Sequence, residues 1–204
     1  MKRINILIIS FFITVSFTGC REDQITLEVL DEVDYELYSL ILDDSWRYLF
    51  NISSNIDEFT VKHETTNWLY ESLTIDQLPS WLKDSFPVID ISVFTDYISK
   101  NKTILYFDSI KFQEAGKVVA LVNQQAYIDN GRFSWTTFYE EYPNSDGVMI
   151  FRRIGYNSDK SQAIVEFEHV PGNGTNGGQG FIIYLAKNNN NEWEIIKWVM
   201  RWIS

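Results

Sequence analysis

The strongest constraint on the fold is the alternation of side chains in the last third of the chain. From Gln162 to Val170, residues suited to a buried face alternate with polar residues. That period of two is typical of a strand in an antiparallel sheet with one face in water. Phe181 to Lys187 is apolar on both faces, so we expect it to lie centrally, covered above and below. The asparagines 188 to 191 predict a hairpin loop, because Asn tolerates a left-handed backbone.

The final strand carries a change of phase. Its apolar residues begin on odd positions, at Trp193 and Ile195, and continue on even positions from Ile196 to Trp202. A period of two cannot change phase without an extra residue. We therefore predict a β-bulge near Ile195 and Ile196, whereas an unbroken ladder along this strand would contradict that interpretation.

The rest of the chain adds helices and further strands. Apolar residues from Tyr35 to Phe50 recur at helical spacing, and Asp90 or Ser92 is placed to cap a second helix. Phe59 to Glu64 and Lys117 to Val122 are strand candidates. Together these patterns predict an α+β domain: a mainly antiparallel sheet with helices packed on one face and a C-terminal four-strand meander.

Residues 1 to 20 have the pattern of an export leader. Lys2 and Arg3 precede an apolar run from Ile4 to Phe17, which is too short to span a bilayer comfortably. Small residues then precede the cysteine in F-T-G-C, which indicates a secretory signal peptide. The end of the leader resembles the lipobox of bacterial lipoproteins, although Phe17 stands where that family usually has Leu.

The lipobox resemblance implies a domain organisation. It implies a signal peptide over residues 1–19, with cleavage before Cys20 and lipidation of that cysteine by several acyl chains, palmitate among them. Stable membrane anchoring takes two signals, such as two acyl chains, and several chains on one cysteine exceed that requirement. We expect residues 20–34 to be the lipidated cysteine and an acidic tether, and 35–204 to be a single domain. The alternative is an ordinary secretory leader with an incidental cysteine.

Two further residue patterns bear on location. In the lipoproteins that this leader resembles, a residue other than Asp after the cysteine, here Arg21, implies transfer to the outer membrane. The acidic pair Glu22 and Asp23 resembles a surface-export tag of the Bacteroidetes group, or is simply part of a solvated tether. We therefore expect a lipid anchor in the outer membrane, with the domain on the periplasmic or cell-surface side.

Charge and cysteine content restrict the partners and the source of stability. The net charge is -11, and loss of Lys2 and Arg3 with the leader would bring it to -13 (-11 minus 2). Phosphate backbones repel such a chain, so we expect no nucleic-acid partner. Because Cys20 is the only cysteine, no disulfide is available, and the core alone must hold an exported domain together.

Few residues match a catalytic or cofactor pattern. Gly172 to Gly177 matches G-x-G-x-x-G, but a strand follows it where a dinucleotide site needs a helix, so we interpret it as a hairpin tip. His63 and His169 are far apart and lack metal-ligand spacing, so we expect no metal and no cofactor. The acidic pairs Asp43–Asp44 and Glu140–Glu141 are interpreted as solvated faces.

Arg153 and His169 are the ligand-binding candidates. His169 is predicted on the inward face of its strand, near the glycine-rich loop. Arg152 and Arg153 point to opposite faces because they are adjacent, so one of them must meet a covered face and needs a carboxylate partner. An ion pair that holds the sheet to a helix is favoured over a ligand contact at this position.

Part of the chain resembles a widespread family of uncharacterised exported bacterial proteins. In that family a W-x-x-F-Y-x-x-Y-P-x-S-x-G helix end precedes a sheet that closes on W-[IV]-S. The matching residues here are Trp135, Phe138, Tyr139, Tyr142, Pro143, Ser145, Gly147, Arg153, Gly155, Tyr156, Gly178, Gly180, Trp193, Met200, Trp202, Ile203 and Ser204. The resemblance covers about a third of the chain. Its motifs mark a fold more than a function, and it implies no catalytic residue.

Three functional hypotheses remain. The first is a non-enzymatic envelope or surface protein, anchored by lipid, that binds an unknown protein or glycan. The second is an envelope hydrolase that acts on glycan or peptide with carboxylates from distant segments. The third has solvent-facing Trp and Tyr side chains stacking on sugars. A concave pocket with two carboxylates at glycosidase spacing, or His169 beside an acid and a hydroxyl, would favour the enzyme.

Overall fold

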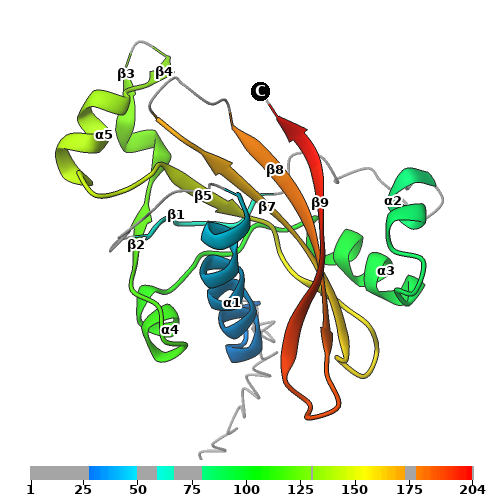
Figure 1. Cartoon of the computed structure of the whole chain (residues 1–204). Coiled ribbons are helices and arrows are strands. Elements are labelled where there is room, and N and C mark those ends of the chain that lie inside the picture. Colours follow the sequence, from blue (N-terminus) through cyan, green and yellow to red (C-terminus); the bar gives the residue numbers. More distant parts are fainter. Residues whose placement is uncertain (1–27, 50–58, 67–79, 130, 173–177, 204) are drawn as a thin grey trace, which may run out of the picture.

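A computed structural model describes residues 28–49, 59–66, 80–129, 131–172 and 178–203 (Figure 1). A seven-stranded sheet has the order β2-β1-β5-β7-β8-β9, with β6 paired to β7. Its strands are β1 (Phe59–Lys62), β2 (Val119–Val122), β5 (Val148–Phe151), β6 (Gly155–Tyr156), β7 (Gln162–Val170), β8 (Gln179–Lys187) and β9 (Trp193–Ile203). A separate pair joins β3 (Ile128–Asp129) to β4 (Arg132–Phe133). The helices are α1 (Glu32–Leu49), α2 (Ser80–Ser85), α3 (Ile91–Lys100), α4 (Ser109–Glu114), α5 (Trp135–Glu141) and the 3-10 helix η2 (Gln124–Tyr127).

The strand pairing confirms an α+β fold with a mainly antiparallel sheet. Strand β1 is parallel to β2 and to β5, and the pairings of β5, β6 and β8 with β7 and of β9 with β8 are antiparallel. β5, β7, β8 and β9 therefore form four adjacent antiparallel strands at the C-terminal side. Asn191, in the turn between β8 and β9, has a φ of 65°, the left-handed conformation expected of the asparagine run.

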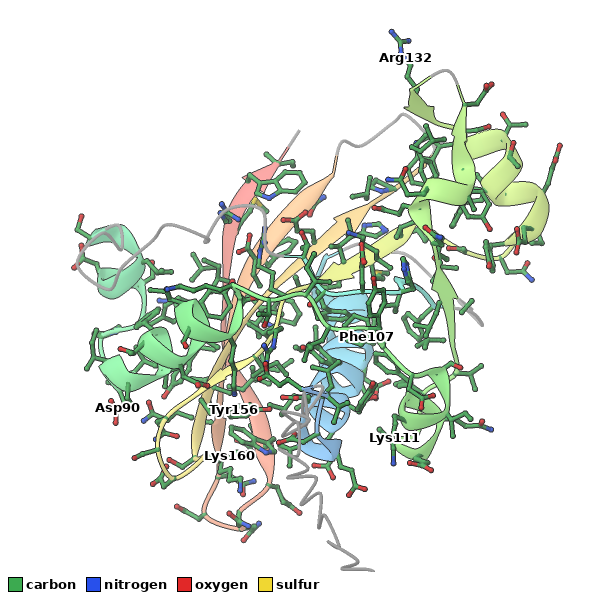
Figure 2. All side chains as sticks on the ribbon, turned by 180° about the vertical axis from the view of Figure 1, so that it is seen from behind. Asp90, Phe107, Lys111, Arg132, Tyr156 and Lys160 are labelled. Carbon is green, nitrogen blue, oxygen red and sulfur yellow. The ribbon has the colours of Figure 1, made fainter. Side chains whose placement is uncertain are left out.

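The helices cover both faces of the sheet, which differs from the expectation of one covered face. α1 and α4 pack on one face, against side chains such as Phe167 and Ile183. α2 and α3 pack on the other, against Ile164, Ile182 and Tyr184 (Figures 1 and 2). The reason is the two-sided apolar pattern of β8. The polar face of β7, predicted to lie in water, is buried as well: Glu166 and Glu168 are 0% and 6% exposed, and Tyr97 of α3 contacts Glu166.

The predicted bulge in the last strand is confirmed. Leu185 pairs with Ile195 and Tyr184 pairs with Lys197, so Ile196 is the extra residue. The ladder shifts again near the C-terminus, between Gly180 and Phe181, where Arg201 is the extra residue. The first shift brings Trp193 and Ile195 to the same face as Trp198, and all three pack against the α1 core.

The domain begins earlier than Tyr35. Asp31 and Asp34 exchange side-chain to backbone hydrogen bonds of 3.0 Å each way, which is the reciprocal arrangement of a capping box at the start of α1. Leu30 is buried in the main core. Residues 28–34 thus belong to the folded domain and not to a solvated tether. Cys20 and the predicted leader lie outside the described residues.

Candidate functional site

Arg152 is the centre of a buried ion network on the α3 face of the sheet. Its side chain is 1% exposed, and its Nε lies 2.8 Å from Glu166 Oε2. One terminal nitrogen lies 3.3 Å from Glu168 Oε1, and the other donates to the carbonyl of Thr66 at 3.2 Å. Because Glu166 and Glu168 are two apart on β7, both carboxylates point to the face that Arg152 occupies.

The network extends from the sheet to a helix and to the edge strand. Tyr97 of α3 donates its hydroxyl to Glu166 Oε2 at 3.1 Å, and Arg201 of β9 forms an ion pair with the other oxygen. Two arginines therefore balance two glutamates. Burial raises the pKa of Glu168, although the charge of Arg152 opposes that change. The group links the residue after β5 to β7, β9 and α3, and through Tyr97 it joins the sheet to a helix, as predicted for the structural ion pair.

Arg153 lies in a different network from Arg152. Its guanidinium pairs with Glu28 and donates to the Lys100 carbonyl at 3.0 Å and to Thr103 Oγ1 at 2.6 Å. The residue is 4% exposed. The predicted ligand-binding arginine thus contacts the N-terminal segment and the end of α3, and its terminal nitrogens already have acceptors within the protein.

His169 is fully buried on the inward face of β7, as predicted. Its Nε2 lies 2.9 Å from the backbone carbonyl of Asp146, while the Asp146 carboxylate is 3.9 Å away. Burial lowers the pKa of His169 to about 4, and the hydrogen bond to Asp146 opposes that change only in part. A neutral imidazole that donates to a carbonyl fixes the loop before β5. His169 and Arg153 do not share a network.

The family-like motif around Ser145 is explained by packing. Ser145 Oγ accepts from the Gly147 N–H at 3.1 Å and lies 2.7 Å from Thr60 Oγ1. A Cβ on Gly147 would stand 2.3 Å from the Val170 carbonyl oxygen. Tyr139 accepts from the Gly172 N–H at 3.1 Å. These residues close the loop between α5 and β5 onto β1 and the end of β7.

The glycine-rich loop is followed by a strand, as expected. Residues 173–177 lie outside the described part of the chain, and β8 begins at Gln179. The helix N-terminus that would hold a pyrophosphate is therefore missing from the segment that follows. A Cβ on Gly180 would lie 2.1 Å from Trp202 Nε1, so this glycine makes room for an indole.

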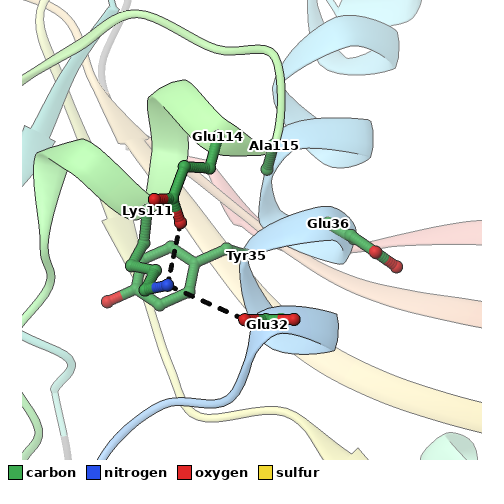
Figure 3. A pocket seen from close by; sticks show the side chains of 6 residues that line it. All are labelled: Glu32, Tyr35, Glu36, Lys111, Glu114 and Ala115. Carbon is green, nitrogen blue, oxygen red and sulfur yellow. Dashed lines mark hydrogen bonds and ion pairs between the residues drawn. The ribbon is translucent and has the colours of Figure 1, made fainter.

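A hollow between α1 and α4 gathers three glutamates (Figure 3). Its volume is about 200 Å³. Lys111 lies 2.8 Å from Glu114 and 3.7 Å from Glu32, whereas Glu36 points away from it in Figure 3. The side chains of Glu32 and Glu114 are 84% and 57% exposed. These are solvated surface ion pairs, which lack the burial that adapts a carboxylate for proton transfer.

A second, larger groove runs between α3 and the turn after β6. Its volume is about 590 Å³, and it is lined by hydroxyl groups of α3 together with Lys100, Lys160 and Tyr156. The two lysine Nζ atoms lie 4.7 and 5.2 Å from the centre of the Tyr156 ring. Each ammonium is already paired, Lys100 with Asp96 and Lys160 with Asp31, both at 2.8 Å.

The structure describes the side chains of three of the four carboxylates in the two acidic pairs. Asp43, Glu140 and Glu141 are exposed, as expected of solvated faces. Within the described ranges, no three His, Cys, Asp or Glu side chains are grouped so that they could hold a metal ion. None of the described helices is both long and apolar enough to cross a membrane.

The outer edge of β9 is the least covered apolar part of the sheet. Ile196, Met200 and Ile203 are 51%, 53% and 64% exposed, and Trp193 and Trp198 are only partly buried. Among the described residues, no strand pairs with this edge. Sequence reasoning missed it because alternation indicates which residues share a face but not which strand ends the sheet.

Comparison of the chain with family models, curated proteins and solved structures finds no match.

Proposed function

We propose that this chain is a lipid-anchored envelope protein, held to the outer membrane through Cys20, that acts as a non-enzymatic binding module. The observation that carries the proposal is the open edge of β9, where three apolar side chains are more than half exposed. Long apolar edge strands promote unwanted pairing, and proteins shield them unless they are used. Exposed apolar patches commonly mark interaction sites.

An extended protein segment is the kind of partner that fits the edge of β9. The unpaired N–H and C=O groups of an edge strand bind another strand through main-chain hydrogen bonds, and side chains on alternate positions supply specificity. The bulges at Ile196 and Arg201 leave Lys197 to Met200 as a regular run between them. A short ladder there, with Ile196 next to it and Met200 at its end as apolar anchors, gives a local and specific contact.

A glycan partner is less well supported by the same surface. Sugar binding by stacking needs several aromatic rings exposed in a row. Here Trp193, Trp198 and Trp202 are all partly buried, and the exposed side chains of β9 are aliphatic or thioether groups together with Glu194 and Lys197. A protein segment therefore suits the edge better than a saccharide.

Site-specific photo-crosslinking in cells tests the proposal. A photoreactive amino acid at Ile196 or Met200 is expected to capture a discrete partner, and one at Ile110 of α4 is not. Ile110 is a matched control because it is also apolar and 62% exposed. Equal capture at the three positions, or none at any, would overturn the assignment of β9. Radioactive fatty acid that is incorporated into the wild type and lost in Cys20→Ala tests the anchor separately.

One observation favours an envelope hydrolase that acts on glycan or peptide as the alternative. Glu166 and Glu168 present two carboxylates to one face, and burial raises the pKa of Glu168, as a general acid requires. Both side chains are less than a tenth exposed and are paired with arginine, which favours a structural role. Hydrolysis of envelope glycan or peptide fragments by the wild type, lost in Glu168→Gln with the fold intact, would establish the enzyme.

A further inference from the structure

Residues 28–34, here called the acidic strap, are bound to the domain by a series of polar contacts. Glu28 pairs with Arg153, Asp31 lies 2.8 Å from Lys160 Nζ, and the Tyr156 hydroxyl donates to Asp34 at 2.8 Å. The partners come from the segment around β6 and from the turn that follows it. The strap therefore lies against the segment around β6 and includes the first residues of α1.

Apolar packing supports these polar contacts. Leu30 is 9% exposed and belongs to the same core cluster as Tyr38 of α1. On either side of it, Val29 is 76% exposed and Asp31 caps the helix. One buried anchor between acidic contacts fixes both the path of the strap and the place where it leaves the domain.

Two carboxylates of the strap, Glu28 and Asp31, are matched by basic partners, whereas burial and the charge of Asp31 raise the pKa of Asp34. The hydrogen bonds from Arg153 lower the pKa of Glu28 despite some burial. Burial works to raise the pKa of Asp31, but the Lys160 ammonium and the Asp34 N–H outweigh it and the pKa is lowered. Both carboxylates therefore remain ionised, and paired, into mildly acidic solution.

The position of the strap sets how far the domain can lie from Cys20. Eight residue steps separate Cys20 from Glu28, and a fully extended chain covers no more than about 29 Å over them. If the strap were free up to Tyr35, fifteen steps would reach about 54 Å. Docking of the strap thus roughly halves the greatest distance between a lipid on Cys20 and the domain.

The arrangement of elements decides which part of the domain would face the lipid. The start of α1 and the turn between β8 and β9 lie at one end of the molecule, and α5, β3 and β4 lie at the other (Figure 1). β9 runs along the axis between these ends. An anchor attached through the strap keeps the first end near the bilayer and leaves the edge of β9 accessible from the side.

We propose that the acidic strap is an orienting device, which holds the α1 end of the domain against the membrane surface and directs α5 and the β3–β4 pair away from it. The inference rests on the proposed lipid anchor at Cys20. It goes beyond anchoring because a free tether of the same sequence would leave the domain able to turn in any direction.

Energy transfer to labelled lipid tests the orientation in the full acylated chain. A donor dye is placed on Asn189→Cys, in the turn between β8 and β9, or on Arg132→Cys of β4 (Figure 2 labels Arg132). The protein is incorporated into phosphatidylethanolamine and phosphatidylglycerol vesicles that carry an acceptor dye on the headgroups. Because the docked chain reaches only about 29 Å, transfer from position 189 should exceed that from 132 at least about threefold.

The test variant lacks the two charges by which the strap pairs with basic residues of the domain. Glu28→Gln with Asp31→Asn removes both ion pairs while Asn preserves the helix cap, and it should reduce the ratio between the two positions at least about twofold. Glu36→Gln with Glu140→Gln changes the net charge equally at exposed positions outside the strap and should leave the ratio unchanged. Thermal unfolding of each variant shows whether it is folded.

The outcomes separate the orientation from the anchor. Failure of the wild type to float with the vesicles would overturn the anchor. Flotation with equal transfer from positions 189 and 132, or an unchanged ratio after charge removal, would overturn the orienting strap alone. Hydrogen exchange of the unacylated Cys20→Ala chain should still protect the Asp31 and Asp34 amides, because both are hydrogen-bonded without any lipid. Rapid exchange of both would also contradict a docked strap.

Discussion

Gly147 carries a conformation that other residues avoid. Its φ is 120°, and a Cβ there would stand 2.3 Å from the Val170 carbonyl oxygen. Gly147→Ala should therefore destabilise the protein by about 2 to 4 kcal/mol, since strained backbone and a steric clash add together. Gly116→Ala is the control, because its φ is 82° but nothing lies within 4 Å of an added Cβ. Urea unfolding measures both, and equal losses would contradict a role for the close approach.

The burial of His169 predicts a loss of stability in mild acid. Burial lowers its pKa from 6.5 to about 4. Below pH 6.5 the unfolded chain binds a proton that the folded protein does not, so this contribution is complete above pH 6.5 and is lost as the pH falls toward 4. A difference of about 2.5 pKa units corresponds to about 3 kcal/mol.

Urea unfolding at pH 7 and pH 4.5 of the wild type, His169→Gln and His63→Gln measures this contribution. The wild type and His63→Gln should lose more stability on acidification than His169→Gln does. Burial raises the pKa values of Asp146 and Glu168, so these two groups stabilise the folded protein as the pH falls. Both are present in all three proteins and do not affect the comparison. The same pH dependence in His169→Gln as in the wild type would show that the imidazole is not responsible.

At the scale of elements, the bulge in β9 determines which side chains meet the core. Deletion of Ile196 would remove the extra residue and close the bulge. Because Lys197 already pairs with Tyr184 and Trp198 with Ile183, neither side chain would change face, and we expect a loss of less than about 1 kcal/mol. Ile196→Ala should cost less than about 1 kcal/mol, because that side chain is 51% exposed. Thermal unfolding of the two variants compares them. A deletion that costs at least about 3 kcal/mol more than the alanine variant would contradict the assigned register.

The buried network makes a second prediction at this scale. Arg152→Met leaves Glu166 and Glu168 without their shared partner and should cost about 3 to 5 kcal/mol near neutral pH. Protonation of a carboxylate relieves that cost, so the loss should shrink as the pH falls to 5. Arg201→Met, at a side chain that is 21% exposed, should cost less. Urea unfolding at both pH values measures each variant, and a loss independent of pH would point to packing alone.

The same elements show what the sequence could and could not predict. The alternation in β7 predicted the buried face of His169, and the phase change in β9 predicted the bulge, because both patterns are local. The parallel pairing of β1 with β2 and β5 joins segments far apart in the chain, and nothing local specifies it. The partners of Arg153 were hidden for the same reason, since Glu28 is 125 residues away.

At the scale of the whole molecule, the polar residues divide into two kinds of role. Arg152, Glu166 and His169 lie inside and hold strands, loops and α3 in register. Glu28, Asp31 and Asp34 join the N-terminal segment to the outside of the same framework. Among the described residues, these side chains hold the fold together, and the edge of β9 is an apolar surface that no strand covers.

The N-terminal boundary of the folded unit provides a prediction for the whole molecule. A chain that begins at Tyr35 loses buried Leu30, worth about 1.5 to 3 kcal/mol, and the cap of α1, worth about 1 kcal/mol. It also leaves Arg153 buried without Glu28, so the free energy of unfolding should fall by at least about 3 kcal/mol. A chain that begins at Ile25 keeps all three features and should unfold like the longer protein. Urea unfolding of the two shortened chains compares their stability. Equal free energies of unfolding would show that residues 28–34 do not stabilise the fold.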